Sequence, residues 1–297
     1  MNFLITGGTG LIGSALCRRL LADDHQIVVL SRQPERVTSP IRAVKQLQQI
    51  SSDQVFDVVI NLAGEAIADK RWSQAQKQRI TSSRFNISQA LIDYLRNTVH
   101  KPRLLISGSA IGYYGLGIGA TELDEDAAAD TSFSSQLCQQ WESIALQAEA
   151  LGIRCCLLRT GIVLAKEGGA LGKMLPVFKM GLGGKIGSGK QWMSWIHLDD
   201  LVGIILHCIE QPELCGAING TAPTPVSNEV FVKALAKALK RPCVLPLPAL
   251  LVRILMGQMG EELLLSGKKI VPKKALQSGY KFQYESLDAA LLNIIPV

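Results

Sequence analysis

Glycines spaced three residues apart follow the first apolar run of the chain. The run FLIT leads directly into GGTGLIG, which places Gly7, Gly10 and Gly13 in the pattern G-x-x-G-x-x-G. The first glycine allows a tight turn, the second lets the backbone approach an anion, and the third allows close helix–strand packing. Amides at a helix start bind phosphate groups. We therefore predict a dinucleotide pyrophosphate site formed by Gly7, Thr9, Gly10, Leu11, Ile12 and Gly13.

The residues after the second apolar run indicate which dinucleotide fits. This run, 27–30, is followed by Ser31 and Arg32, with Arg36 one turn further on. An NAD site has Asp or Glu here, because a carboxylate accepts from the ribose 2′-hydroxyl. Arginine instead donates charge-assisted hydrogen bonds to the 2′-phosphate of NADP. We predict NADP(H) as the cofactor, with these three residues around the 2′-phosphate; an exposed arginine of a loop is the alternative.

Short apolar runs alternate with longer segments that have helical spacing. We predict strands at 3–6, 27–30, 58–62, 104–107 and 155–158. The helical patterns between them span 11–22, 73–96 and 134–150. This alternation predicts an α/β fold with a Rossmann-type, doubly wound parallel sheet, whose binding sites collect at the carboxyl ends of the strands.

The character of the chain changes after Gly161. We predict an NADP-binding domain at 1–160, completed by part of 196–220, and a smaller, mostly substrate-side lobe with a helical C-terminal extension at 161–297. Residues 161–195 contain nine glycines and little periodicity, which predicts a long irregular segment over the binding site. Helices are expected at 199–211, at 228–239 and from 250 onward.

Composition excludes several classes of protein. Apolar residues make up 47% of the chain and charged residues 19%, which favours a folded globular protein over a disordered one. The apolar stretch 245–256 is interrupted and too short to span a membrane. Seven cysteines without a CxxC pair predict reduced thiols and no metal site, and no signal peptide is visible, so we expect a soluble cytoplasmic protein. The net charge of +6 suits an anionic small molecule as well as an anionic polymer, but no nucleic-acid module is visible, and neither a nucleic-acid nor a membrane partner is predicted.

Four motifs resemble the short-chain dehydrogenase/reductase superfamily, in its extended, epimerase-like branch: TGGTGLIG, DVVINLAGE, LLISGSAIGYYG and WIHLDDLV. The chain looks most like the NADP-binding epimerase family proteins of the atypical group, through KRW, WE, GSGKQWMSWIHLDD and the C-terminal LLLSGKKIVPKKAL. The resemblance implies a nicotinamide-ribose side lined by Asn61, Leu62, Ala63 and Gly64, with Ser107 also at the cofactor. It further implies that Ser109 hydrogen-bonds the reacting oxygen.

The acid–base pair of that superfamily is absent. Active members carry Tyr and Lys spaced Y-x-x-x-K, with a Glu commonly four residues later. Counting back from Glu142 places Ser134 and Cys138 at these positions. A tyrosine must become about three pKa units more acidic to act near neutrality, roughly 4 kcal/mol, and the lysine charge contributes to that shift. The chain therefore needs another source of proton transfer.

Tyr113 and Tyr114 are the substitutes that we predict beside Ser109, with aromatic packing as the alternative reading. Arg159 ends the fifth predicted strand and either meets a cofactor or substrate phosphate or forms an ion pair. The resemblance implies that residues 168–195 face the substrate, so cations and aromatics there would suit an anionic or nucleotide-linked ligand; a flexible, solvent-exposed loop is the alternative. These residues are Lys173, Lys179, Lys185, Lys190, Gln191, Trp192 and Trp195, with Lys70, Arg71 and Trp72 expected at the same cleft.

Two functions remain open from the sequence. One is an NADP(H)-binding oxidoreductase or nucleotide-sugar epimerase-like enzyme, and the other is a non-catalytic protein that senses NADPH. The long helix expected at 73–96 is a candidate homodimer face.

Overall fold

A seven-stranded parallel sheet forms the centre of the computed structural model, which describes residues 1–295. The strand order is β11-β7-β5-β4-β1-β2-β3, so the chain starts in the middle and winds outward in both directions. This is the doubly wound Rossmann arrangement, and the predicted fold class is confirmed. The strands are β1 (Asn2–Thr6), β2 (Gln26–Leu30), β3 (Arg42–Val44), β4 (Val58–Asn61), β5 (Leu104–Ala110), β7 (Arg154–Thr160) and β11 (Gly216–Gly220).

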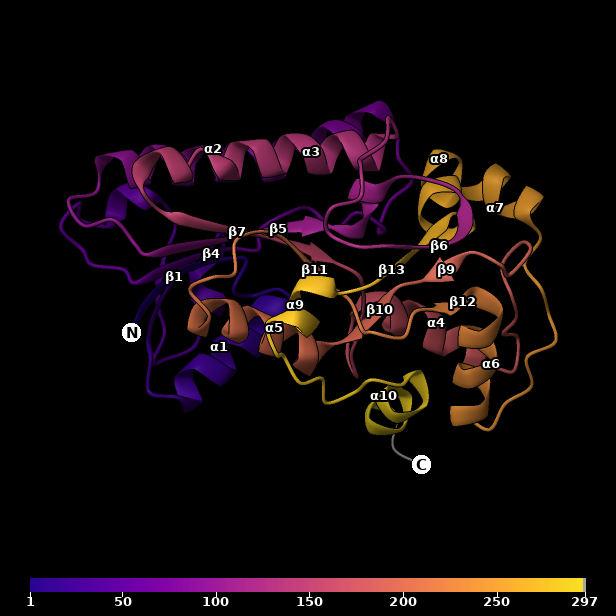
Figure 1. Cartoon of the computed structure of the whole chain (residues 1–297). Coiled ribbons are helices and arrows are strands. Elements are labelled where there is room, and N and C mark those ends of the chain that lie inside the picture. The colour runs from indigo at the N-terminus through magenta and orange to yellow at the C-terminus, as the bar shows by residue number, and fades with distance from the viewer. Residues whose placement is uncertain (296–297) are drawn as a thin grey trace.

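Helices cover both faces of the sheet (Figure 1). One face carries α2 (Gln74–Asn97) and α3 (Phe133–Leu146), and the other carries α1 (Leu11–Ala22) and α5 (Leu198–Glu210). Side chains alternate along each strand, so Phe3 and Ile5 join the core beneath α1 and α5, whereas Leu4 joins the core beneath α2. The strands read as continuous apolar runs because both faces are buried.

The C-terminal part of the chain forms a second packed region with its own apolar cluster, which includes Phe178, Trp195, Phe231 and Leu291. The prediction of a long irregular segment at 161–195 is wrong, because these residues hold a helix and three short strands. Local composition hid the helix, because glycines begin it and Pro176 lies inside it, and both residue types disfavour helices. The elements are β8 (Ile162–Leu164), α4 (Gly169–Lys179), β9 (Trp192–Met193), β10 (Trp195–His197), β12 (Val226–Ser227), α6 (Asn228–Ala238) and α10 (Leu287–Ile294).

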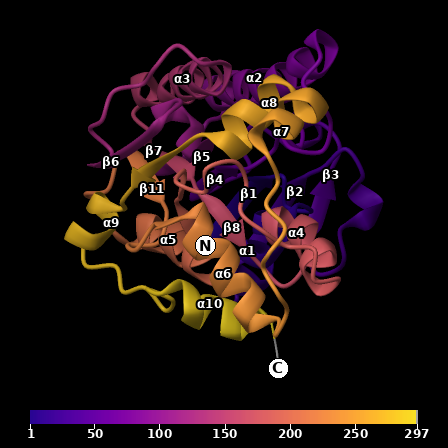
Figure 2. The same cartoon turned by 90° about the vertical axis from the view of Figure 1, so that its right-hand side faces the viewer.

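Residues 249–277 lead the chain back toward α3 (Figure 2). Met259 packs with Trp72, Ile80 and Leu137, which joins this segment to α2 and α3. Its strand β13 (Gly267–Ile270) pairs in parallel with β6 (Ile118–Leu123). The helical elements here are α7 (Ala249–Met256), α8 (Gln258–Gly260), the π-helix η5 (Glu261–Leu265) and α9 (Lys273–Gln277).

Four short 3₁₀ turns complete the described elements: η1 (Pro34–Arg36), η2 (Leu47–Gln49), η3 (Ile111–Tyr114) and η4 (Glu149–Leu151).

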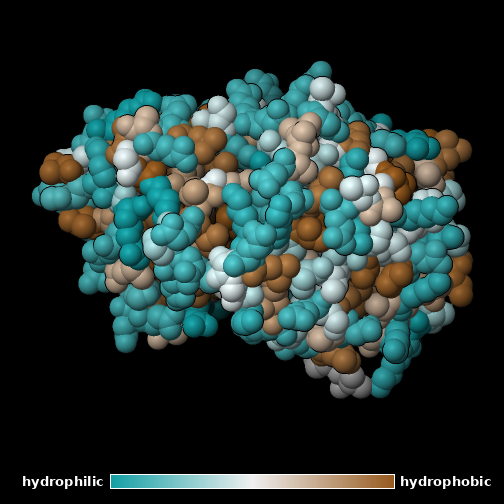
Figure 3. Space-filling view, viewed as in Figure 1, coloured by the Kyte–Doolittle hydropathy of each residue, from teal (hydrophilic) through white to brown (hydrophobic). Residues whose placement is uncertain are grey.

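In Figure 3, apolar residues gather at the end of the molecule that holds α7, where Leu250, Ile254 and Leu255 are exposed. Along residues 1–295, every helix is too short or too polar to cross a membrane. The boundary between two domains near residue 160 stays a prediction.

A buried carboxylate attaches the C-terminal segment to the Rossmann part. Asp200, in the first turn of α5, is fully buried. Its oxygens accept from the backbone amides of Gln283 at 2.8 Å and Tyr284 at 2.9 Å, and from the Tyr280 hydroxyl at 3.2 Å. These hydrogen bonds are part-buried, and their loss would leave three donors without this acceptor, so this one side chain holds residues 280–284 against α5.

We expect Asp200→Ala to lower the free energy of unfolding by at least about 2 kcal/mol, because three part-buried donors lose their charged acceptor and hydrogen bonds to charged groups contribute about 1.5–3 kcal/mol each. Urea denaturation followed by circular dichroism measures the change. Asp199→Ala is the matched control: this neighbouring side chain is 57% exposed, and its loss should cost less than about 1 kcal/mol. Equal effects of the two substitutions would contradict this role of Asp200.

Candidate functional site

The turn between β1 and α1 has the geometry that its glycines predict. Gly7 has φ +73°, and a Cβ on it would lie 2.6 Å from the backbone carbon of Leu62. A Cβ on Gly13 would lie 2.2 Å from the Gly7 oxygen. Helix α1 has Gly10 as its N-cap, without a side-chain cap and without an acidic residue in its first turn. The opening amides of α1 therefore form a cradle without a side-chain cap, and such amides can bind an anion.

Two arginines follow β2 beside this turn. Arg32 and Arg36 are exposed, and neither forms an ion pair with a carboxylate of residues 1–295. The Ser31 hydroxyl accepts from the Gln33 amide at 3.1 Å, while the Ser31 amide donates to the Val44 oxygen at 3.0 Å. The loop is thus held in place while its cationic side chains stay available to an anion.

The end of β4 is built around Asn61. Its Oδ1 accepts from the Thr6 hydroxyl at 2.6 Å, and its Nδ2 donates to the Ser88 hydroxyl at 2.9 Å. The side-chain amide thereby connects β1, β4 and α2, and it is 1% exposed. The residues that follow it, Leu62, Ala63 and Gly64, are more accessible than Asn61. Ser107 is buried in β5, where its hydroxyl donates to the Gly108 oxygen at 3.4 Å.

A buried ion pair lies at the ends of β5 and β7. Arg159 donates from Nε to Glu142 Oε1 and from Nη2 to Oε2, each at 2.9 Å. Ser109 donates to Glu142 Oε1 at 2.6 Å. Burial opposes the guanidinium charge, but hydrogen bonding and attraction to Glu142 raise the Arg159 pKa above its ordinary value. Of the two roles left open for Arg159, the ion pair is the one with contacts in this structure.

The two tyrosines of η3 differ in their surroundings. Tyr114 is buried, donates to Asn219 Oδ1 at 2.6 Å and accepts from Arg159 Nη1 at 3.0 Å. Burial raises the pKa of Tyr114 to about 12, against a smaller lowering by Arg159. Tyr113 is half-buried, with its ring 3.3 Å from the Arg159 guanidinium carbon. Its hydroxyl takes no part in this network, which leaves it available to a ligand.

The residues at the Y-x-x-x-K positions have other partners. The Ser134 amide and hydroxyl donate to Glu262 Oε2 at 3.0 and 2.6 Å, which places a carboxylate of η5 at the start of α3. The Cys138 thiol contacts the Ala110 oxygen at 3.6 Å, and burial, followed by Glu142, raises its pKa to about 11. Sequence reasoning missed Glu262, because no local pattern links residues that lie 128 positions apart.

The start of helix α4 lies against Leu11, the first residue of α1. A Cβ on Gly169 would lie 3.1 Å from a Leu11 methyl group, and Lys173 Nζ donates to Asp69 Oδ1 at 2.5 Å. Other members of the predicted substrate set are structural here. Trp72 donates to the Ile67 oxygen at 2.8 Å, and Trp195 is fully buried and donates to the Thr224 oxygen at 3.0 Å.

The remaining members of that set differ in exposure. Gln191 is buried, and its Nε2 donates to the Leu264 oxygen at 2.8 Å. Trp192 is half-buried, with Lys269 Nζ 5.0 Å from its ring centre. Cations at the surface are supplied by Lys70, Arg71, Lys179, Lys185 and Lys190.

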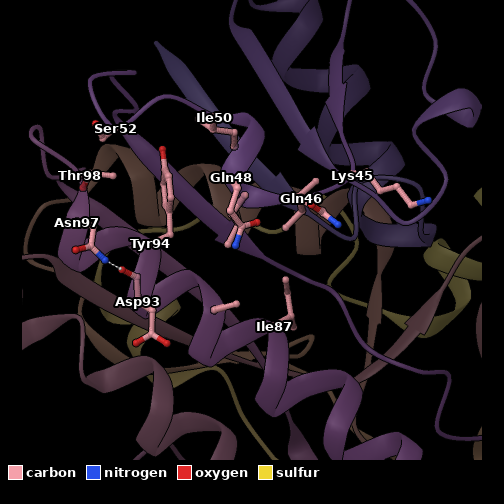
Figure 4. Close-up of a pocket in the computed structure, with 13 residues that line it drawn as sticks. Lys45, Gln46, Gln48, Ile50, Ser52, Ile87, Asp93, Tyr94, Asn97 and Thr98 are labelled. Carbon is pink, nitrogen blue, oxygen red and sulfur yellow. Dashed lines mark hydrogen bonds between the residues drawn. The ribbon is translucent and has the colours of Figure 1, made fainter.

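A pocket of about 700 Å³ lies between α2 and the segment after β3 (Figure 4). Lys45 and Gln46 line one end of it, and Ser52 and Thr98 line the other. The end at Gln46 is near the carboxyl end of β2, because Leu30 also lines the pocket. No motif in the sequence pointed to these residues.

Comparisons with known proteins agree with this geometry. Residues 3–219 match the model of the NAD dependent epimerase/dehydratase family, and 247–294 match a domain of unknown function, DUF1731. The Staphylococcus saprophyticus epimerase family protein SSP1921 is 39% identical over 99% of both chains. The human epimerase family protein SDR39U1 is 36% identical over 99% of this chain and all of the relative.

Solved structures show the same relationship. The crystal structure of human SDR39U1 (isoform 2) with NADPH superposes with a TM-score of 0.90, at 33% identity over 99% of both chains. A Thermotoga maritima UDP-glucose 4-epimerase with UDP-glucose has a TM-score of 0.80 at 18% identity over 99% of this chain and 97% of the other, and so shares the fold. The glycine turn, the strand order and the end-to-end similarity to these relatives place the chain in the NAD dependent epimerase/dehydratase family.

Proposed function

We propose that this protein binds NADP(H) along the carboxyl edge of its sheet. The observation that carries the proposal is the cradle at Gly7, Gly10 and Gly13, with Arg32 at the end of the neighbouring strand. The cradle's amides would hold the pyrophosphate, and Arg32 with Arg36 would bind the 2′-phosphate. The NADPH in the crystal structure of a relative 33% identical to this chain supports the same assignment.

We further propose an oxidoreductase, in which the nicotinamide exchanges a hydride with a substrate carbonyl carbon. Tyr113 is the group that we assign to proton transfer at the substrate oxygen, because Tyr114 and Ser109 are already engaged in the buried network. Ser109 can still accept a hydrogen bond while donating to Glu142. The Arg159 guanidinium over the Tyr113 ring would hold that ring in place.

One observation favours a second function. Ser134 and Cys138 fill the Y-x-x-x-K positions and have protein partners, so the usual proton-transfer pair is absent. A protein of this kind would bind NADPH and change its contacts with the redox state of the cofactor, without turnover. The two functions share the cofactor site and differ only in whether a carbonyl is reduced.

Several broader features belong to this proposal. The exposed lysines of 179–190 favour an anionic or nucleotide-linked substrate, and α2 remains the proposed face for a homodimer. A cytoplasmic location suits the cysteines, since five of the seven are buried and all are free thiols.

Arg32→Ala should weaken NADPH binding by about ten- to hundredfold, because charge-assisted hydrogen bonds to the 2′-phosphate are lost. NADH binding should change far less, since that cofactor lacks this phosphate. Isothermal titration calorimetry with both cofactors measures the effect. Arg18→Ala, which removes an exposed arginine of α1, is the control and should leave both affinities unchanged. Unchanged NADPH affinity in Arg32→Ala would refute the assignment.

Tyr113→Phe should slow NADPH oxidation by about a hundredfold or more, because general acid catalysis contributes about 10²–10⁴-fold. The assay follows absorbance at the nicotinamide band with a panel of aldehydes and ketones, and calorimetry confirms that cofactor affinity is retained. Full activity in the variant would exclude Tyr113 as the proton donor. A wild-type protein that binds NADPH but turns over no carbonyl would favour the sensing function.

Tyr114→Phe should lower the free energy of unfolding by about 1–3 kcal/mol, because Asn219 and Arg159 lose a buried partner. Tyr94→Phe is the control: the Tyr94 hydroxyl is buried without a partner among residues 1–295, so its removal should cost nothing in urea denaturation.

The Tyr114 pKa gives this prediction a pH dependence. The native pKa of about 12 exceeds the ordinary value of 10. The stabilisation from a protonated Tyr114 is therefore complete below pH 10 and is lost as pH rises from 10 toward 12. Tyr114→Phe should remove this loss of stability between pH 10 and pH 12. If the free energy of unfolding has the same pH dependence in the wild-type protein and the variant, the role of the buried hydroxyl is contradicted.

A further inference from the structure

Arg84 of α2 points to the same edge of the sheet as the glycine turn. A Cβ on Gly64, three residues beyond β4, would lie 3.0 Å from the Arg84 guanidinium carbon. That carbon is 5.1 Å from the Trp141 ring of α3. The guanidinium thus lies between the loop after β4 and the face of α3 that packs on β5.

The charge of Arg84 lacks a counterion. Its Nη1 donates to the Ile80 oxygen of its own helix at 3.0 Å, but no carboxylate of residues 1–295 lies within ion-pair distance. Burial lowers the pKa of Arg84, and Glu65 and Cys138 oppose that effect only from a distance. A guanidinium has five N–H donors and stays charged, so a half-buried one with a single backbone acceptor has donors to spare for a ligand.

The Arg84 charge lies near the position where this chain lacks the lysine of the superfamily. Cys138 stands where the superfamily has its lysine, one helical turn before Trp141. The Cys138 thiol is neutral near pH 7, because burial raises its pKa to about 11, and so it supplies no cation. The Arg84 guanidinium lies over the Trp141 ring and beside Gly64, and so brings a positive charge from a different helix to the same region.

We propose that Arg84 binds the nicotinamide half of the cofactor, with its guanidinium donating to the ribose hydroxyls there. It thereby replaces, from α2, the cation that α3 lacks. The proposal rests on the proposed binding of NADP(H), because Gly64 lies on the nicotinamide-ribose side only if the cofactor occupies the glycine cradle. The competing explanation is that Arg84 is a packing residue for Trp141.

Binding of two ligands that share the adenosine half of the cofactor tests the proposal. NADPH contains the nicotinamide riboside, whereas 2′,5′-ADP contains only the adenosine end with its phosphates. Arg84→Met should weaken NADPH binding by about tenfold or more, since a charged group loses its hydrogen bonds, and should leave 2′,5′-ADP binding unchanged. Arg84→Lys should recover most of the NADPH affinity. Arg79→Met, which removes an exposed arginine of the same helix, is the control and should alter neither ligand.

The outcomes separate the two proposals. If the wild-type protein binds no NADPH, the proposed function itself fails. If the wild-type protein and Arg84→Met bind NADPH equally, only the role of Arg84 is overturned. The role of Arg84 is also overturned if Arg84→Met lowers the affinity for NADPH and for 2′,5′-ADP alike. It is overturned as well if Arg84→Lys binds NADPH as weakly as Arg84→Met, because the shape of the side chain rather than its charge would then matter. Should Arg84→Met not fold, Arg84→Gln keeps a planar group against Trp141 and gives the same comparison.

Discussion

The close approach of two backbones at the centre of the sheet is the constraint on which the site depends. Gly7 has a positive φ and leaves no room for a Cβ beside Leu62, and the Gly7 oxygen leaves no room for one on Gly13. Any larger residue would separate β1 from β4 or lift α1 off the sheet. The contact aims the opening amides of α1 at the carboxyl edge, where the ends of β2, β4 and β5 also meet.

A second layer of buried polar contacts keeps that edge rigid. The Glu142 carboxylate accepts hydrogen bonds from the Ser109 hydroxyl and from Nε and Nη2 of Arg159. Arg159 also donates to the Tyr114 hydroxyl, which in turn donates to Asn219. A buried ion pair of this kind is favourable only when its remaining hydrogen-bonding capacity is satisfied, as it is here. Ser109, Tyr114 and Arg159, which look chemically active in the sequence, thereby also stabilise this edge of the sheet. Beside this network, Tyr113 and Arg84 keep hydrogen-bonding capacity for a ligand, as Arg32 and Arg36 do at the end of β2.

Local sequence predicted the parts of the molecule that depend on local chemistry. The five apolar runs became neighbouring strands, because alternate side chains of a central parallel strand are buried on both faces. The glycine turn was readable because its three glycines lie within seven residues at a recognisable spacing, although the Leu62 backbone that Gly7 approaches lies far along the chain. Helix α4 was not predicted, because its glycines and Pro176 have low helix propensity and its stability comes from packing on the C-terminal core.

The candidate site was predictable only in part for the same reason. Contacts such as Ser134 with Glu262 join residues far apart in the chain and leave no local pattern. The pairing of Arg159 with Glu142 was one of two open readings, because sequence cannot tell whether a cation at a strand end meets a carboxylate or a phosphate. Arg84 went unnoticed, since a lone arginine in an otherwise ordinary helix carries no signal until its neighbours are known.

A crystal structure of this protein with NADPH tests the central claim most directly, that the carboxyl edge of the sheet holds the cofactor. The account predicts the pyrophosphate against the first amides of α1, the 2′-phosphate at Arg32, and the nicotinamide between Gly64 and Tyr113. A cofactor bound elsewhere, for example along α2 in the pocket of Figure 4, would contradict it.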